Sequence, residues 1–360
     1  MPLHYYFGVE IEAIAEPHTV RSPLLRWVYY EKLATALRWD GLEALADREV
    51  QYRKHSEHYD KWWITRDGSL KNPPHPQIPL EAVSPIMSTR QRWENEIDMF
   101  WASWHRIFHM PIQSNKCGSH VHISPWPEKE FRLDQLKSIA FGIILYEPLI
   151  EELLPANRRH NRFCEMNSSY SSRLRVCWDL QTVWIRIRGC DYKWELRRLM
   201  QEDKGTREDR YVLWNFDNIL EGRSGTVEFR GGRGLRGPVR TKRWIAFVIA
   251  FIDMCLGEGY DSWDDFERPS MTMFWSKILW SASRNGIDDS LPSNWRAMPE
   301  LVRDGILEDV SDTESSDGSV ASSTLSKSDD AYCDSDCSEC DKEFIIEELE
   351  QERREICVIL

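Results

Sequence analysis

Three short segments of this sequence each place two polar side chains two residues apart. In a β-strand, residues i and i+2 point to one face, and the residue between them points to the other. The middle residue is apolar in all three segments, which predicts strands with one polar and one apolar face. The segments are Glu10-Ile11-Glu12, His120-Val121-His122 and Glu228-Phe229-Arg230. If these strands are neighbours in one sheet, their polar faces converge, and Glu81 of a short predicted strand (residues 80–84) adds another carboxylate.

The residue types in this pattern fit one kind of chemistry. Mg²⁺ prefers carboxylate oxygens, and hard cations accept imidazole as a minority ligand. Magnesium also bridges substrate phosphates, and an arginine beside it can neutralise charge on a transferring phosphoryl group. The pattern therefore predicts a nucleotide–magnesium phosphotransfer site built on a sheet. The sequence contains no Gly-x-x-x-x-Gly-Lys-Ser/Thr motif, so a P-loop is excluded.

Each polar pair taken alone also has a purely structural explanation. A Glu-x-Glu strand is often only the solvent-exposed face of an edge strand, whereas a His-x-His strand is rarer. All three pairs lie close to glycines, at Gly8, Gly118 and Gly231. Together they are difficult to explain as three solvated faces, so the joint pattern favours a metal–nucleotide site.

Hydrophobic periodicity predicts short strands that alternate with amphipathic helices. Strands are expected at residues 5–13, 62–65, 80–85, 118–124, 211–216 and 225–230, the last two forming a hairpin with its turn at 221–224. Helices are expected at residues 24–45, 89–109, 134–154 and 238–256, followed by a mixed, mainly helical region at 260–303.

The acidity of the chain is confined to its last part. The 360 residues carry a formal net charge of −13, and residues 304–360 contain 18 acidic and 4 basic residues, a net of −14. Residues 1–303 therefore have a net charge of +1, and they hold all 17 tryptophans. A neutral body rich in aromatic residues predicts one well-packed catalytic domain over residues 1–303. No basic surface for nucleic acid follows from the total charge.

The composition changes sharply at Asp304. Residues 304–342 are rich in Ser and Asp and nearly lack large apolar residues, which predicts a disordered acidic tail. Clusters around Ser311, Ser335 and Ser338 suit an acidophilic kinase, and a purely solubilising tail explains the composition equally well. Residues 343–360 regain a helical pattern, so a short C-terminal helix is expected there.

The last four residues are Cys357-Val358-Ile359-Leu360, which matches a CaaX signal for geranylgeranylation of Cys357. The acidic segment before it argues against a lipid anchor, because anionic lipids would repel it. The alternative is an ordinary helix end. The N-terminus lacks a signal-peptide pattern, and no apolar stretch is long enough to cross a bilayer. The expected location is cytoplasmic, at the cytosolic face of a membrane if Cys357 is prenylated.

Seven motifs, taken in order, resemble the amidoligase family, which is related to glutamine synthetase and glutamate–cysteine ligase. They are FGVEIE (7–12), DGSL (67–70), LEAVSPIM (80–87), CGSHVHIS (117–124), RRHNRFC (158–164), RYVLWN (210–215) and TVEFRGG (226–232). The resemblance covers roughly residues 5–256. It implies an α+β fold with a glutamine-synthetase-like, curved, mainly antiparallel sheet. The site would lie on the concave face, with helices packed on the outer face.

The resemblance also implies a reaction, in which ATP drives formation of a peptide-like amide bond between a carboxylate and an amine through an acyl phosphate. The implied cofactors are ATP and two or more Mg²⁺ ions, and the implied partners are small-molecule or peptide acids and amines, with no nucleic acid. Two long segments, residues 40–61 and 176–204, depart from the family pattern where substrate loops would lie. The identity of the acid and the amine therefore does not carry over.

Matching the motifs assigns roles to single residues. The implied metal ligands are Glu10, Glu12, Glu81, His120 and Glu228. The implied catalytic residues are Arg230, which steadies the transferred phosphoryl group, His122 near the substrate, and Asp67, which positions the amine or orients a ligand. The implied nucleotide or carboxylate contacts are Arg230, Ser119, Arg159, Asn161 and Arg162. The roles of His120 and His122 are interchangeable at this level, and Asp67 is equally explained as a turn residue before Gly68.

Two other functions fit parts of the pattern. A cupin-type metalloenzyme needs a Glu three or four residues after the second His, but five residues separate His122 from Glu128. A non-catalytic, membrane-tethered binding relative would not need every carboxylate and Arg230. Both alternatives are therefore disfavoured against the ligase.

Overall fold

The computed structural model describes residues 4–20, 24–47, 59–70, 73–110, 116–202, 204–258 and 267–299. The predicted acidic tail with its kinase sites, the predicted C-terminal helix and Cys357 all lie outside these residues. No helix within the described ranges is long and apolar enough to cross a membrane.

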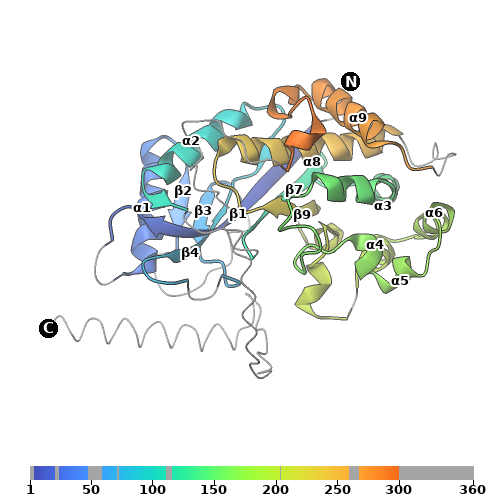
Figure 1. Ribbon diagram of the computed structural model, residues 1–360, viewed down its shortest axis with the longest axis horizontal. Helices are drawn as coiled ribbons and strands as arrows, with labels where there is room; N and C mark the ends of the chain where they lie inside the picture. The colour runs from blue at the N-terminus through green and yellow to red at the C-terminus, as the bar shows by residue number, and fades with distance from the viewer. Residues whose placement is uncertain are drawn as a thin grey trace, which may run out of the picture.

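A mixed, largely antiparallel open sheet of nine strands forms the centre of the described structure (Figure 1). The main order is β2-β3-β4-β1-β7-β9-β8, and β5 and β6 also pair with β1. Among the described strands, only β2 and β3 run parallel. The strands are β1 Tyr5–Pro17, β2 Ala44–Ala46, β3 Trp62–Thr65, β4 Ile78–Val83, β5 Met87–Ser88, β6 Phe108–His109, β7 Gly118–Pro125, β8 Trp214–Asn215 and β9 Val227–Arg233. The predicted α+β class is confirmed.

Strand β1 carries the polar–apolar alternation that the sequence predicted. Every second side chain along it is buried, including Phe7, Val9 and Ile11, whereas Glu10 and Glu12 are only half-buried. Because alternate side chains point to opposite faces, the two carboxylates share the face opposite the apolar core.

Nine α-helices occur in the described residues. They are α1 Arg26–Trp39, α2 Trp93–His105, α3 Leu133–Leu153, α4 Asn167–Tyr170, α5 Ser172–Arg175, α6 Leu180–Arg188, α7 Lys193–Met200, α8 Pro238–Glu258 and α9 Met271–Arg284. Short 3₁₀ helices occur at η1 Arg207–Arg210, η2 Asp217–Ile219, η4 Asp288–Ser290 and η5 Trp295–Ala297.

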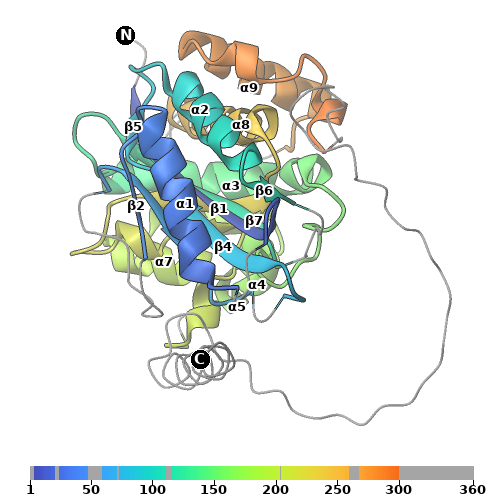
Figure 2. The same ribbon diagram turned by 90° about the vertical axis from the view of Figure 1, so that its left-hand side faces the viewer.

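Helices α1, α2 and α8 cover the apolar face of the sheet (Figures 1 and 2). Aromatic contacts hold this layer, such as Trp62 of β3 stacked on Phe100 of α2 with ring centroids 4.1 Å apart. On the same face, towards the β8 edge of the sheet, Phe229 of β9 stacks on Trp244 of α8 with ring centroids 5.5 Å apart. Burial of such large rings stabilises the layer and leaves the opposite face of the sheet for polar groups.

Helices α4, α5 and α6 lie apart from this layer, to the right of the strands and below α3 in Figure 1. Helices α6 and α7 pack against α3 through buried apolar side chains that include Val183, Ile187 and Leu196. The segment that departs from the family pattern, residues 176–204, therefore contributes α6 and α7 to this subdomain.

Three predicted elements are shorter than expected. The helix predicted at residues 24–45 ends at Trp39, because Gly41 adopts a φ of +92° that stops the helix and the chain then enters β2. The helix predicted at 89–109 ends at His105, since Phe108 and His109 pair with β1 as β6. The strand predicted at 211–216 is reduced to Trp214–Asn215. It pairs antiparallel with β9, which confirms the predicted hairpin, and η2 lies in the connection between the two strands.

Candidate active site

The strand order brings the three polar segments side by side. Strands β4, β1, β7 and β9 are successive neighbours, so each segment lies against the next. Glu12 is opposite Glu81, Glu10 is opposite His120, and His122 is opposite Glu228. Residues directly opposite in an antiparallel pair share a face, so all the polar pairs converge on one patch of the sheet.

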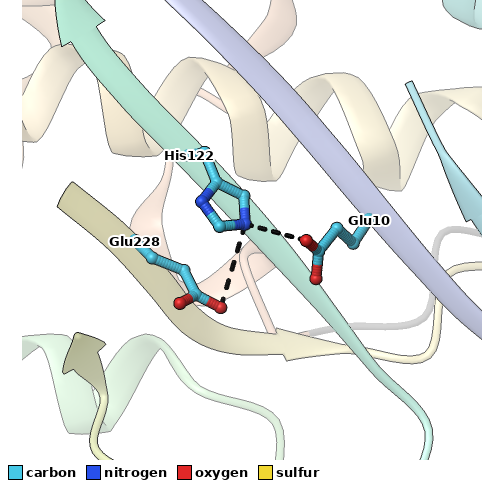
Figure 3. Close-up of side chains that lie close together, drawn as sticks. All are labelled: Glu10, His122 and Glu228. Carbon is cyan, nitrogen blue, oxygen red and sulfur yellow. Dashed lines mark hydrogen bonds and ion pairs between the residues drawn. The ribbon is translucent and has the colours of Figure 1, made fainter. Parts of the chain in front are cut away.

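The side chains in this patch touch one another. Glu10 lies between the two histidines, with Oε2 2.8 Å from His120 Nδ1 and Oε1 3.1 Å from His122 Nε2. Glu228 Oε1 lies 3.4 Å from His120 Nδ1 and 3.9 Å from His122 Nε2. Glu10, His122 and Glu228 each offer a ligand atom within 4.8 Å of the other two, and Figure 3 shows these side chains converging from β1, β7 and β9.

A bulge between β7 and β9 shapes one side of the patch. Ser119 pairs with Gly232 and Val121 with Phe229, so two residues of β9, Arg230 and Gly231, lie opposite one residue of β7. A Cβ atom on Gly231 would lie 2.5 Å from the ring of Phe229, so only glycine fits there. Arg230 then turns back along its own strand, and its Nη1 donates to Glu228 Oε1 at 2.6 Å.

Glu10, Glu228 and the histidines form an electrically balanced half of the patch. Burial opposes ionisation of Glu10, but the charge of His122 and hydrogen bonds from both histidines hold its pKa well below the usual value. Burial likewise opposes ionisation of Glu228, and the charges of Arg230 and His122 lower its pKa to about 2. The pKa of His122 rises to about 9, since the charges of Glu10 and Glu228 outweigh its burial. Burial and the charge of Arg230 lower the pKa of His120 to about 4.

The other half of the patch has too little positive charge. Burial, followed by the charge of Asp67, raises the pKa of Glu12 to about 8. Burial and the charges of Glu10 and Asp67 raise the pKa of Glu81 well above its usual value. Burial also raises the pKa of Asp67, although hydrogen bonds from Ser69 oppose this. Buried carboxylates that repel one another in this way are a donor set suited to a divalent cation, which would lower all three pKa values.

Four of the residues predicted to contact nucleotide or substrate make their observed contacts elsewhere. The Ser119 hydroxyl donates to the Arg233 carbonyl at 3.1 Å. Arg159 donates to the carbonyls of Leu154 and Glu152, both at 2.9 Å, at the end of α3. Asn161 accepts from the Phe163 amide, and Arg162 stacks on the Phe163 ring with 4.8 Å between its guanidinium carbon and the ring centroid. Arg230 is the predicted nucleotide contact whose bond to a carboxylate of the patch, Glu228, is described above.

Three residues beside the patch were missed by sequence reasoning. Asn215 of β8 donates from Nδ2 to Glu228 Oε2 at 2.7 Å. Arg158, 1% exposed, donates from Nη2 to the Arg230 carbonyl at 2.5 Å. Arg210 lowers the pKa of Asp67 and Glu81 by its charge. All three belong to the motifs RRHNRFC and RYVLWN, so the sequence indicated that these segments matter for function. It did not show which of their side chains point to the sheet.

These features define an α+β protein whose candidate site lies on the polar face of an open, largely antiparallel sheet, with carboxylates, imidazoles and a guanidinium in contact. The family described as putative amidoligase enzyme matches residues 3–252, more than two thirds of the chain, and the chain belongs to this family. Membership indicates an amide-forming ligase. No curated protein and no solved structure matches the chain.

Proposed function

We propose that this protein is an ATP- and Mg²⁺-dependent carboxylate–amine ligase that forms an amide bond through an acyl phosphate. One observation carries the proposal: the polar segments of β1, β4, β7 and β9 meet on one face of the sheet as a carboxylate-rich patch with Arg230 at its side. The family supports the ligase class, and the donor set supports a magnesium nucleotide as the energy source.

The residues of the patch fit two metal positions. Glu10, His122 and Glu228 converge closely enough for a shared cation. Glu12, Glu81 and Asp67 have raised pKa values that a second cation would relieve. This grouping favours His122 over His120 as a ligand. When bound, Mg²⁺ would neutralise phosphate charge in a site where the protein supplies few cations.

Arg230 is fixed for contact with a phosphoryl group. Its Nη1 is held by Glu228 at 2.6 Å and its Nε points to the Phe163 carbonyl at 3.5 Å. A guanidinium has five N–H donors, so a group anchored in this way can still donate to phosphoryl oxygens. A pre-oriented cation stabilises charge in the transition state without reorganising.

The reaction has two steps. A carboxylate oxygen of the acid attacks the γ-phosphorus of ATP and ADP leaves, which gives an acyl phosphate. The amine then attacks the acyl carbon, phosphate leaves with the bonding electron pair, and the amine loses a proton to a base. We assign Asp67 to orienting the amine for this attack, because its buried carboxylate lies beside Glu12 and Glu81, and the departing phosphate can take the proton. In the metal-free protein the charges of Glu10 and Glu228 raise the pKa of His122 to about 9. A cation bound between these carboxylates would displace that proton, so that the neutral imidazole of His122 could serve as a ligand.

The test is ADP release by the purified full chain with Mg²⁺, ATP and pools of carboxylic acids, amines and peptides. Release should require both an acid and an amine, and it should disappear in Glu10→Gln. Glu16→Gln is the matched control, since Glu16 lies further along β1 with the same parity as Glu10 and Glu12. Nucleotide binding without turnover would favour a binding relative, and absence of both would overturn the proposal.

A further inference from the structure

Helix α6 carries an exposed surface that the proposed function does not use. Its buried side chains, Val183 and Ile187, face α3, while Ile185 and Arg188 point outwards. Exposed aromatic and apolar residues lie just before and just after the helix. We define the α6 surface by six residues: Val176, Trp178, Ile185, Arg188, Tyr192 and Trp194.

The apolar character of this surface is unusual for a solvated helix. Trp178 is 88% exposed, and Tyr192 and Trp194 stack on each other with ring centroids 6.2 Å apart. Five of the twelve most exposed large hydrophobic residues in the described structure fall within residues 176–194. Concentrated exposed aromatic side chains mark an interaction site more often than scattered single ones do.

Arginines outnumber aspartates at and beside the α6 surface. Arg175, Arg186 and Arg188 are exposed there, as are two aspartates, Asp179 and Asp191. The Arg188 guanidinium carbon lies 4.8 Å from the ring centroid of Trp184, a cation–π contact on the same helix. Aromatic rings beside such arginines fit an extended peptide of negative charge.

The chain itself contains such a peptide. Residues 304–342 have 12 acidic and 2 basic residues and lie outside the described structure. A domain of about 300 residues has a radius of gyration of about 19 Å, whereas 40 residues can extend to roughly 130 Å. The tail can therefore reach any face of the body. Because it is tethered, its effective concentration at that face is on the order of millimolar.

We propose that residues 304–342 dock on the α6 surface, with acidic side chains against the arginines at and beside it. The inference goes beyond the proposed function and does not depend on it. A chain of hydrogen bonds connects the end of α7 to the candidate active site. The residue after α7, Gln201, donates to Asn215 Oδ1 at 3.1 Å, and Asn215 holds Glu228. Docking on the α6–α7 subdomain therefore acts on the element that orients a candidate metal ligand.

The experiment uses the full chain with a photo-crosslinking amino acid at position 178. Trp178 is almost fully exposed, so this substitution leaves the core untouched. Position 39 is the matched control, because Trp39 is 87% exposed but lies on α1. Peptides from residues 304–342 should be crosslinked to position 178 in the monomer and not to position 39. Crosslinks only between two chains, or equal yields at both positions, would overturn the proposal.

Charge provides a second readout. Reversing two charges with Arg186→Glu and Arg188→Glu should lower the crosslink yield roughly tenfold. Raising the salt from 0.1 to 1 M shortens the screening length from about 10 Å to about 3 Å and should have a similar effect. Phosphorylation by an acidophilic kinase adds negative charge and should raise the yield. A yield that is insensitive to all three changes would contradict an electrostatic contact.

Discussion

Replacing Glu12 with Gln should stabilise the unliganded protein while it abolishes ligase activity. The Glu12 side chain is only 13% exposed and lies beside other acids, so its ionised form is unfavourable in the folded state. Loss of solvent together with the charge of Asp67 raises its pKa to about 8. The carboxamide of Gln has nearly the same shape. Its oxygen can still accept from the Gly118 amide, which lies 2.8 Å from Glu12 Oε2.

The size of the effect follows from the shift in pKa. A raised pKa means that the folded state binds the proton more tightly than the unfolded state. The contribution of protonated Glu12 to the free energy of unfolding is therefore fully present below the unfolded pKa and is lost as the pH rises through the folded pKa. The shift runs from 4.5 to about 8. Each pH unit within that window lowers the free energy of unfolding of the wild type by about 1.4 kcal/mol. At pH 7 the wild type has therefore lost about 3 kcal/mol of this free energy, and Glu12→Gln has not.

The assay is urea unfolding from pH 4.5 to 8 in the absence of divalent cations. The difference in the free energy of unfolding between Glu12→Gln and wild type should grow steadily with pH. Glu10→Gln is the control, and it should have the opposite sign, since the charge of His122 holds the pKa of Glu10 low and removal of the carboxylate leaves His122 without its partner. Equal, pH-independent destabilisation by both substitutions would refute the electrostatic account.

Three further predictions concern other parts of the structure. Burial raises the pKa of Glu147 to about 7, so the free energy of unfolding of the wild type should fall by about 3 kcal/mol between pH 4.5 and 7. Urea unfolding of Glu147→Gln should not show this decrease. Gly142→Ala would place a Cβ in steric overlap with Cys255 Sγ where α3 crosses α8, and calorimetry should show destabilisation of about 1–3 kcal/mol. Asn215→Leu removes the donor to Glu228 and should raise the Mg²⁺ concentration for half-maximal ADP release about tenfold to a hundredfold. It should also lower the unfolding temperature, because Gln201 and the Asp217 amide lose the Asn215 Oδ1 acceptor.

The parts of the site that lie on regular strands were predictable from the sequence. Period-two alternation fixes which side chains share a face, so the placement of Glu10 and Glu12 together follows from their spacing alone. The prediction that several polar faces converge required the strands to be neighbours, and nothing in the local sequence specifies this. The register supplies the missing information by placing Glu12 beside Glu81 and His122 beside Glu228.

The loop that contains RRHNRFC shows where sequence reasoning stops. Three of its arginines are nearly adjacent, and in a loop no periodicity tells which one points to the sheet. The structure places Arg158 against the backbone of Arg230 and turns Arg159 to the end of α3. Asn215 was missed for a related reason, because β8 is only two residues long and so short a strand has no alternation to show which side chain points to the polar face.

The imbalance of charge in the patch makes its two halves differ in how they affect the stability of the unliganded protein. Glu10 and Glu228 already have cationic partners in His122 and Arg230, so they are fixed in place in the unliganded protein. Glu12 and Glu81 keep raised pKa values although the charges of Arg230 and Arg210, respectively, act against this, and their repulsion makes the unliganded fold less stable than it would be with neutral residues. A ligand that binds only the folded state recovers this loss. A cation that binds the patch should therefore stabilise the wild type more than Glu12→Gln, and thermal unfolding with and without Mg²⁺ distinguishes a patch selected for binding from one that merely tolerates buried acids.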